Sequence, residues 1–244
     1  DAHIKVNEKG EITEIIEGEF LDEDRPDLKI AMDQRDAHAE KIWQAQKKAL
    51  DERPQFPPRK DHVPRTEVKL GGFGGQGIIS AGRIIGQAAA IHDKLEACFT
   101  QSYGPEARGG AAGSQVAIAS DPIHHPHPIQ PTSMIILSQG AFTKYVPSLA
   151  PGGVLLIDNG LVELPEDHRQ DITTHGIAAT KIATEAGTSR AANTVMLGFW
   201  AAITGVISRD AMRQTVAESV PAKTVELNLS VFDAGFEEGL AVKS

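Results

Sequence analysis

The chain of 244 residues has a single cysteine, Cys98, and no long apolar run. One thiol cannot hold an iron–sulfur cluster or a Cys-based zinc site, and it cannot form a disulfide within the chain. Cys98 lies in an apolar segment, which favours a buried structural thiol. No stretch approaches the ~20 apolar residues of a membrane-spanning helix, and the first residues lack the apolar core of a signal peptide. We therefore expect a cytoplasmic protein without a membrane span.

A basic surface is also absent from the sequence. The 24 lysines and arginines are outnumbered by 33 aspartates and glutamates, and the formal net charge is −9. Because a nucleic-acid-binding protein needs a basic face to neutralise phosphates, this charge argues against nucleic acid as a partner. It does not exclude a local basic pocket for a phosphorylated cofactor. The length and the 41% hydrophobic content suit one α/β domain with an appendage.

Residues 1–53 are predicted to form an N-terminal extension, a β-hairpin followed by a long amphipathic helix. Short apolar alternation around a glycine-containing turn predicts the hairpin. Asp24 can cap the helix, which has Pro26 in its first turn and an apolar stripe at roughly heptad spacing. That stripe either docks a partner subunit or folds back on the chain's own domain. Residues 54–66 are proline-rich and predict an extended linker to a second domain, 67–244.

Residues 67–244 alternate strand-like and helix-like segments. Continuous apolar runs are typical of strands that are buried on both faces of a sheet. Their alternation with helices predicts a Rossmann-like, mostly parallel sheet with helices on both faces. The expected strands cover 67–70, 95–100, 115–119, 133–138 and 154–158. The expected helices cover 78–91, 142–149, 178–186, 191–204 and 209–219.

A glycine-rich loop joins the first of these strands to the first helix. Its sequence, Gly72-Phe73-Gly74-Gly75-Gln76-Gly77, fits G-x-G-x-x-G. Glycine permits positive φ and lets backbone amides approach an anion, and a helix N-terminus adds about half a positive charge. The same motif also forms a tight turn without any ligand. The candidate binding residues in this loop are Gly74, Gly75, Gln76 and Gly77.

A dinucleotide site also needs a carboxylate at the end of the second strand, where it binds the ribose hydroxyls. That strand is expected to end in Phe99-Thr100-Gln101-Ser102, which contains no carboxylate. NAD is therefore disfavoured, and another phosphate-bearing ligand or a partner is favoured. A stand-alone NAD(P)-dependent Rossmann oxidoreductase is kept as an alternative, as is a non-catalytic assembly protein.

The loop after that strand contains an arginine between glycines. Arg108 can bind a phosphate or a carboxylate through two parallel hydrogen bonds, and Gly109 and Gly110 leave room for such a group. Glu106 can hold the guanidinium in place. The alternative is an internal Glu106–Arg108 pair that only stiffens the loop.

Three histidines stand close together in His124-His125-Pro126-His127-Pro128. Such a group could ligate zinc or another borderline metal. No carboxylate or other fourth ligand is suggested nearby, and the prolines favour a rigid exposed loop. We therefore predict no metal site in this chain, and the role of His124, His125 and His127 stays open.

The two glycine loops together resemble a known family. The first loop, the following Ala81-Gly82 and the segment Tyr103-Gly104-Pro105-Glu106-Ala107-Arg108-Gly109-Gly110 are similar to the gamma subunit or domain of pyruvate and other 2-oxoacid:ferredoxin oxidoreductases. The segment 192–198 also resembles that family. The resemblance covers roughly 67–244 and leaves the extension 1–53 unexplained.

The resemblance implies an oxidoreductase subunit that works with alpha, beta and ferredoxin-like delta subunits, and with ferredoxin or another electron acceptor. Such a complex decarboxylates a 2-oxoacid, transfers the acyl group to coenzyme A and passes electrons through [4Fe-4S] clusters. Thiamine diphosphate, Mg²⁺ and the clusters would lie in the partner subunits. This chain alone would bind no cofactor, carry no catalytic residue and show no activity. The 2-oxoacid stays open among pyruvate, 2-oxoglutarate, branched-chain and aryl compounds.

The same resemblance implies that this chain shares the coenzyme A site with its partners. The residues that we expect near coenzyme A or near the subunit boundary are Gly74, Gly75, Gln76, Gly77, Tyr103, Glu106, Arg108, Gly109 and Gly110.

Overall fold

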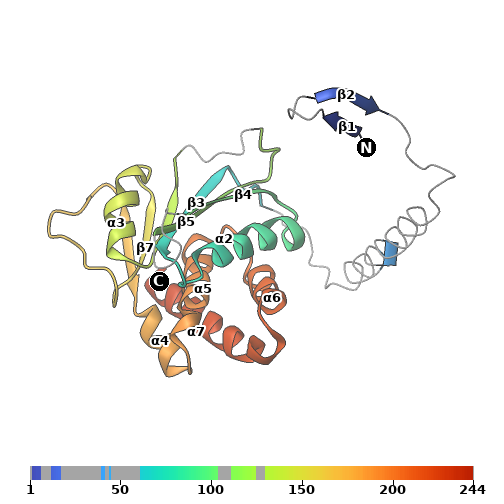
Figure 1. The fold of residues 1–244 in the computed structure, drawn as a ribbon. Coiled ribbons are helices and arrows are strands. Elements are labelled where there is room, and N and C mark those ends of the chain that lie inside the picture. The colour runs from blue at the N-terminus through green and yellow to red at the C-terminus, as the bar shows by residue number, and fades with distance from the viewer. Residues whose placement is uncertain are drawn as a thin grey trace. The chain divides into compact units, whose positions relative to one another are not determined.

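The computed structural model describes residues 2–6, 12–17, 40, 41, 44, 61–103, 111–124 and 130–243. The chain forms two compact units, Asp1–Gln55 and Phe56–Ser244. In the first unit, β1 (Ala2–Val6) and β2 (Ile12–Glu17) pair in the antiparallel sense expected of the hairpin (Figure 1). The predicted long helix falls outside the described residues, except at positions 40, 41 and 44, which are helical. The predicted division into extension, linker and domain stays a prediction.

The second unit is built on a six-stranded sheet with the order β4-β5-β3-β6-β7-β8. Strands β3, β6, β7 and β8 are parallel, while β5 runs antiparallel between β3 and β4. The expected mostly parallel sheet is therefore confirmed, with one antiparallel strand inserted. The bounds are β3 (Thr66–Phe73), β4 (Glu96–Tyr103), β5 (Ala111–Ala119), β6 (Ser133–Ile136), β7 (Val154–Asp158) and β8 (Thr173–Ile177).

Helices cover both faces of this sheet, as expected (Figure 1). On one face, helices pack on Val68 and Leu70 to form the larger core. They are α2 (Ile78–Gln87), α4 (Ala179–Glu185), α5 (Ala192–Thr204), α6 (Arg209–Ser219) and α7 (Val225–Lys243). On the other face, α3 (Gln139–Tyr145) packs Phe142 and Tyr145 against Met134. Short π or 3₁₀ segments cover Ala88–His92, Val146–Ser148, Ser189–Ala191 and Ala222–Thr224.

Two elements, β8 and α7, are not among those predicted from the sequence. Strand β8 has the sequence Thr-Thr-His-Gly-Ile and lies at the sheet edge, so it lacks the apolar run of a central strand. Helix α7 contains Gly235 and Gly239, which usually indicate a turn. In the fold these glycines lie in the helix interior, where they allow another helix to approach closely.

Cys98 is half-buried, which corrects the expectation of a buried thiol. Its neighbours Ala97 and Phe99 pack against the larger core. Because successive side chains of a strand point to opposite faces, Cys98 points away from that core. The apolar character of the segment therefore reflects only one face of β4.

The closest helix packing in the second unit joins α5 to α7. A methyl group added at Gly198 would collide with the carbonyl oxygen of Phe232, and one added at Gly235 would collide with that of Val195. Helix α5 is buried almost all round, and Trp200 at its centre donates from Nε1 to Ser133 Oγ at 3.0 Å. The glycines thus bring the two backbones together and hold α5 under the sheet.

We predict that Gly198→Ala lowers the free energy of unfolding by about 1–3 kcal/mol, because the new methyl group overpacks a backbone contact. Gly86→Ala in α2 is the matched control, since its added methyl group meets only side-chain atoms at 3.7 Å. That control should leave stability unchanged or raise it by about 0.5–1 kcal/mol. Urea unfolding followed by circular dichroism measures both, and equal effects of the two substitutions would contradict the packing argument.

Candidate functional site

The carboxyl ends of β3, β6, β7 and β8 meet at one edge of the sheet. The glycine loop after β3 leads to α2 on one face, whereas the chain after β6 leads to α3 on the other. Connections that leave neighbouring parallel strands toward opposite faces open a crevice between them, and open α/β sheets bind ligands there. The candidate site therefore lies at the ends of β3 and β6.

Two glycines of the loop have left-handed backbone conformations. Gly75 has φ of 99° and Gly77 has φ of 73°, a region that other residues rarely adopt. No atom lies within 4 Å of a methyl group placed on Gly75, so this side of the loop is open. Gly77 caps α2 and is crowded by Asn193, whose Nδ2 donates to the Gly77 carbonyl at 3.3 Å. One glycine thus faces open space and the other packs against the start of α5.

The side chain of Gln76 ties the loop to the neighbouring strand. Its Oε1 accepts from the backbone N–H of Phe73 at 2.6 Å, and its Nε2 donates to the carbonyl of Leu137 at 2.8 Å. Leu137 directly follows β6, so the amide bridges the crevice between the two strand ends. The side chain of this candidate residue therefore holds the loop in shape.

The second glycine loop is bracketed by strand ends at the same sheet edge. Ala111 at the start of β5 pairs with Phe73, and Ala112 pairs with Tyr103 at the end of β4. Glu106, Arg108, Gly109 and Gly110 lie outside the described residues. The sheet therefore brings the two ends of this loop beside the first glycine loop, and the role of the loop's own residues stays a prediction.

The strand order bears on the dinucleotide alternative. Strand β4 is separated from β3 by β5, so its end is not the neighbouring position that binds ribose in a dinucleotide fold. The parallel neighbour of β3 is β6, which leads into Leu137 and Ser138 without a carboxylate. NAD binding is disfavoured here for a second reason that the sequence did not reveal.

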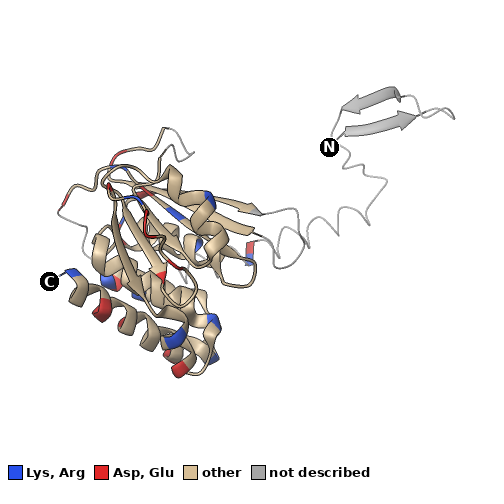
Figure 2. Ribbon diagram, turned by 90° about the vertical axis from the view of Figure 1, so that its left-hand side faces the viewer, with Lys and Arg blue, Asp and Glu red and all other residues tan. Residues whose placement is uncertain are grey.

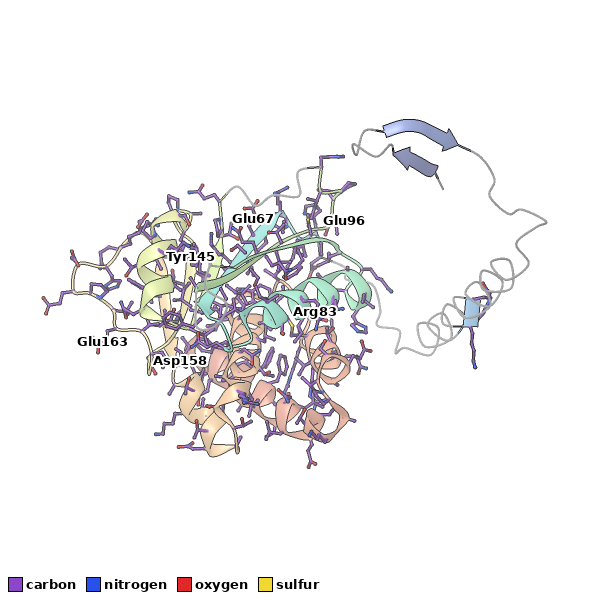
Figure 3. All side chains as sticks on the ribbon, in the orientation of Figure 1. Glu67, Arg83, Glu96, Tyr145, Asp158 and Glu163 are labelled. Atoms are coloured by element: carbon purple, nitrogen blue, oxygen red, sulfur yellow. The ribbon has the colours of Figure 1, made fainter. Side chains whose placement is uncertain are left out.

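Asp158 at the end of β7 is fully buried and engaged (Figure 3). Its Oδ2 accepts from Thr180 N at 2.9 Å and from Thr180 Oγ1 at 2.5 Å, and its Oδ1 accepts from Gly160 N at 3.1 Å. These bonds join the start of α4 to the loop after β7. Asp158 is therefore a positioning residue for the walls of the crevice.

Among the described residues, two hollows lie along this edge. A cavity of about 250 Å³ is lined by Gly75, Gln76, Leu137, Leu161, Thr180, Ser189, Arg190 and Ala192. A wider groove of about 530 Å³ is lined by Gln139 and residues 159–165, so Leu161 borders both. The sequence prediction includes Gly75 and Gln76 but misses Thr180, Ser189 and Arg190. Only the fold brings these three residues, more than 100 positions away in the chain, to the glycine loop.

Lys69 lies in the middle of β3, and its side chain is on the face of the sheet that α3 covers. Its Nζ lies 4.3 Å from the centre of the Tyr145 ring of α3. Burial lowers the pKa of Lys69, and the positive charge of Lys144 lowers it further. Lys69 does not line the cavity beside the glycine loop.

The remaining expectations concern metals, membranes and nucleic acid. His124 is exposed, while His125 and His127 lie outside the described residues. Over the part of the chain that the structure describes, no cluster of metal-ligating side chains and no helix fit to cross a membrane is found. Acidic and basic residues lie on the helices of the second unit (Figure 2), and Asp233 of α7 accepts from Arg209 and Arg213 of α6 at 3.1 and 3.0 Å.

The fold and the site define a Rossmann-like α/β domain with a glycine loop at a crevice between parallel strands. The family model described as pyruvate ferredoxin/flavodoxin oxidoreductase matches residues 67–238. The chain belongs to this family, which confirms the resemblance seen in its glycine loops. Within the family it corresponds to the gamma subunit of multi-subunit 2-oxoacid oxidoreductases.

Three relatives illustrate the degree of similarity and the share of each chain that it covers. The chain is 46% identical over 174 residues to 2-oxoglutarate synthase subunit KorC of Methanocaldococcus jannaschii, covering 71% of this chain and 93% of that subunit. The gamma subunit of a keto/oxoacid ferredoxin oxidoreductase from Geobacter sulfurreducens has a TM-score of 0.64 and 41% identity, covering 72% of this chain and 99% of its own. A 2-oxoglutarate:ferredoxin oxidoreductase from Magnetococcus marinus shares the fold, with a TM-score of 0.64 at 23% identity over 74% of this chain and 31% of its own.

We predict that Gln76→Glu lowers the free energy of unfolding by about 1–3 kcal/mol, because a carboxylate cannot donate to the Leu137 carbonyl. Gln170→Glu is the matched control, since it makes the same charge change at an exposed amide that bonds one carbonyl, that of His168. The control should change stability by less than about 0.5 kcal/mol. Urea unfolding at neutral pH measures both. A Gln76→Glu variant as stable as the control would show that the bridge does not hold the loop.

Proposed function

We propose that this chain is the gamma-type subunit of a coenzyme-A-acylating 2-oxoacid:ferredoxin oxidoreductase and that it contributes part of the coenzyme A site. The complex converts a 2-oxoacid, coenzyme A and oxidised acceptor into acyl-CoA, CO₂ and reduced acceptor. The observation that carries the proposal is the meeting of the glycine loop with the two ends of the second loop at one sheet edge, in a chain of this family. The Magnetococcus enzyme, which shares the fold, has coenzyme A and succinyl-CoA bound.

The chemistry of the reaction requires cofactors that we assign to partner subunits. One cysteine cannot ligate a [4Fe-4S] cluster, which needs four thiolates. The sequence also lacks a Gly-Asp-Gly segment followed by paired asparagines, of the kind that binds magnesium and diphosphate. We therefore propose that alpha and beta subunits hold thiamine diphosphate and Mg²⁺, and that a ferredoxin-like delta subunit holds the clusters. Electrons then leave to ferredoxin or another acceptor.

We predict that the purified chain alone is colourless and does not oxidise 2-oxoacids, because it carries neither clusters nor a catalytic group. The complex purified with its partner subunits should reduce a viologen dye when both coenzyme A and the correct 2-oxoacid are present. Pyruvate, 2-oxoglutarate, 2-oxoisovalerate and phenylglyoxylate form the substrate panel. A brown and active preparation of this polypeptide alone would contradict the assignment of the clusters and the catalytic cofactor to partner subunits.

We predict that Arg108→Ala in the complex raises the KM for coenzyme A about tenfold, because one charge-assisted contact to an anionic group is lost. The KM for the 2-oxoacid should not change. Arg83→Ala, at an exposed position of α2, is the control for the loss of one positive charge. If Arg108→Ala leaves the KM for coenzyme A at the wild-type value, the arginine only stiffens its loop.

A further inference from the structure

Two lysines meet at one aromatic ring on the face of the sheet that α3 covers. The Nζ atom of Lys69 in β3 lies 4.3 Å from the centre of the Tyr145 ring, and the Nζ atom of Lys144 lies 5.2 Å from the same centre. Tyr145 (Figure 3) is buried, Lys69 is half-buried and Lys144 is exposed. A half-buried ammonium group therefore has a second ammonium group as its neighbour.

Two glycines fix the position of this ring. Gly71 of β3 pairs with Gly113 of β5, and Tyr145 lies against both. A methyl group added at Gly71 would come within 2.7 Å of Tyr145 Cδ2, and one added at Gly113 would come within 3.0 Å of the Tyr145 hydroxyl oxygen. The ring is thus held directly on the sheet beside Lys69, where it covers one side of the ammonium group.

No carboxylate of the described residues offsets the charge of Lys69. Glu67 lies two positions earlier on the same face of β3, but its Oε1 is engaged by Arg65 Nη2 at 2.8 Å. The residues that pair with Lys69 on the neighbouring strands, Gln115 and Met134, carry no charge. The charge that acts on this ammonium group is therefore the positive charge of Lys144.

Burial and the charge of Lys144 both lower the pKa of Lys69. A lysine that is desolvated, or that lies beside another cation, carries more neutral amine near neutral pH, and the neutral amine is the nucleophile. The face of the Tyr145 ring attracts cations, but it serves both lysines, and their mutual repulsion remains. These contacts favour attack by Lys69 on an electrophilic carbonyl group over attack by an exposed lysine.

We propose that Lys69 is an acylation site, which takes its acyl group from the acyl thioester that the complex forms. Nζ attacks the thioester carbonyl, the carbon–sulfur bond breaks and an amide forms on Lys69. Coenzyme A leaves as the free thiol with the proton that the amine loses, so no oxidant or further reactant is needed. The supply of the thioester rests on the proposed function, whereas the reactivity of Lys69 does not.

The first test uses the full chain with acetyl-CoA as the reagent. Peptide mass spectrometry measures the rate of amide formation at Lys69 and at Lys181, an exposed lysine that lies 3.9 Å from Glu185. Near neutral pH, Lys69 should react roughly fivefold faster, because a lowered pKa leaves more of its amine neutral. The difference should shrink as the pH rises and Lys181 also loses its proton. In urea, where the fold is lost, the two lysines should react alike.

Variants test the role of the second cation. Lys144→Gln should slow the acylation of Lys69 roughly threefold, because the pKa of Lys69 then rises toward its ordinary value. Lys223→Gln is the matched control, since it removes an exposed charge from the short turn between α6 and α7, which cover the other face of the sheet. Lys69→Arg keeps the charge and should give no amide at this position. Equal rates at Lys69 and Lys181 in the folded chain, or no effect of Lys144→Gln, would overturn the proposal.

The second test uses the assembled complex, supplied with the 2-oxoacid, coenzyme A and an electron acceptor but with no acyl-CoA. Loss of the coenzyme A thiol reports acyl-CoA formation, and mass spectrometry reports the amide on Lys69. Amide that accumulates as the thiol is consumed supports the proposal. Thiol consumption without amide on Lys69 would overturn acylation in the complex. If no thiol is consumed, the proposed function fails and the source of the thioester with it, while faster acylation of Lys69 in the first test would still establish its reactivity.

Discussion

The two hydrogen bonds of the Gln76 side chain hold together the end of the sheet at which the candidate site is built. One bond closes the glycine loop on Phe73 and the other reaches Leu137 at the end of the neighbouring strand. Connections leave these two strands toward opposite faces, so no backbone ladder continues beyond their ends. A side-chain amide supplies both a donor and an acceptor, and it can therefore replace one step of that ladder.

Asp158, at the end of β7, likewise holds neighbouring segments together at this edge of the sheet. Because it is fully buried, its carboxylate is stable only when hydrogen bonds replace the lost water. Thr180 and Gly160 supply those bonds, and in doing so they fix the start of α4 and the loop that carries Leu161. The walls of the cavity are thus held in place by polar groups that bond one another within the protein.

Much of the second unit could be predicted from the sequence because two of its inner strands, β6 and β7, are largely apolar. The runs that became β6 and β7 are buried on both faces, and α5 and α6 agree with their predicted bounds to within a residue. The helix α7 could not be predicted in this way. Its glycines serve a contact with α5, and single-residue preferences carry no information about which helix will lie opposite.

The sequence by itself determined the family and the position of the glycine loop, because both depend on short runs of neighbouring residues. The tertiary structure alone decided that Arg190, Thr180 and Leu161 share a cavity with that loop. It also decided that β5 lies between β3 and β4. This strand order brings the two ends of the second glycine loop, which joins β4 to β5, beside the first glycine loop. These relations arise from strand order and from side chains packed across the sheet. No local pattern records them, because the residues concerned are distant in the chain.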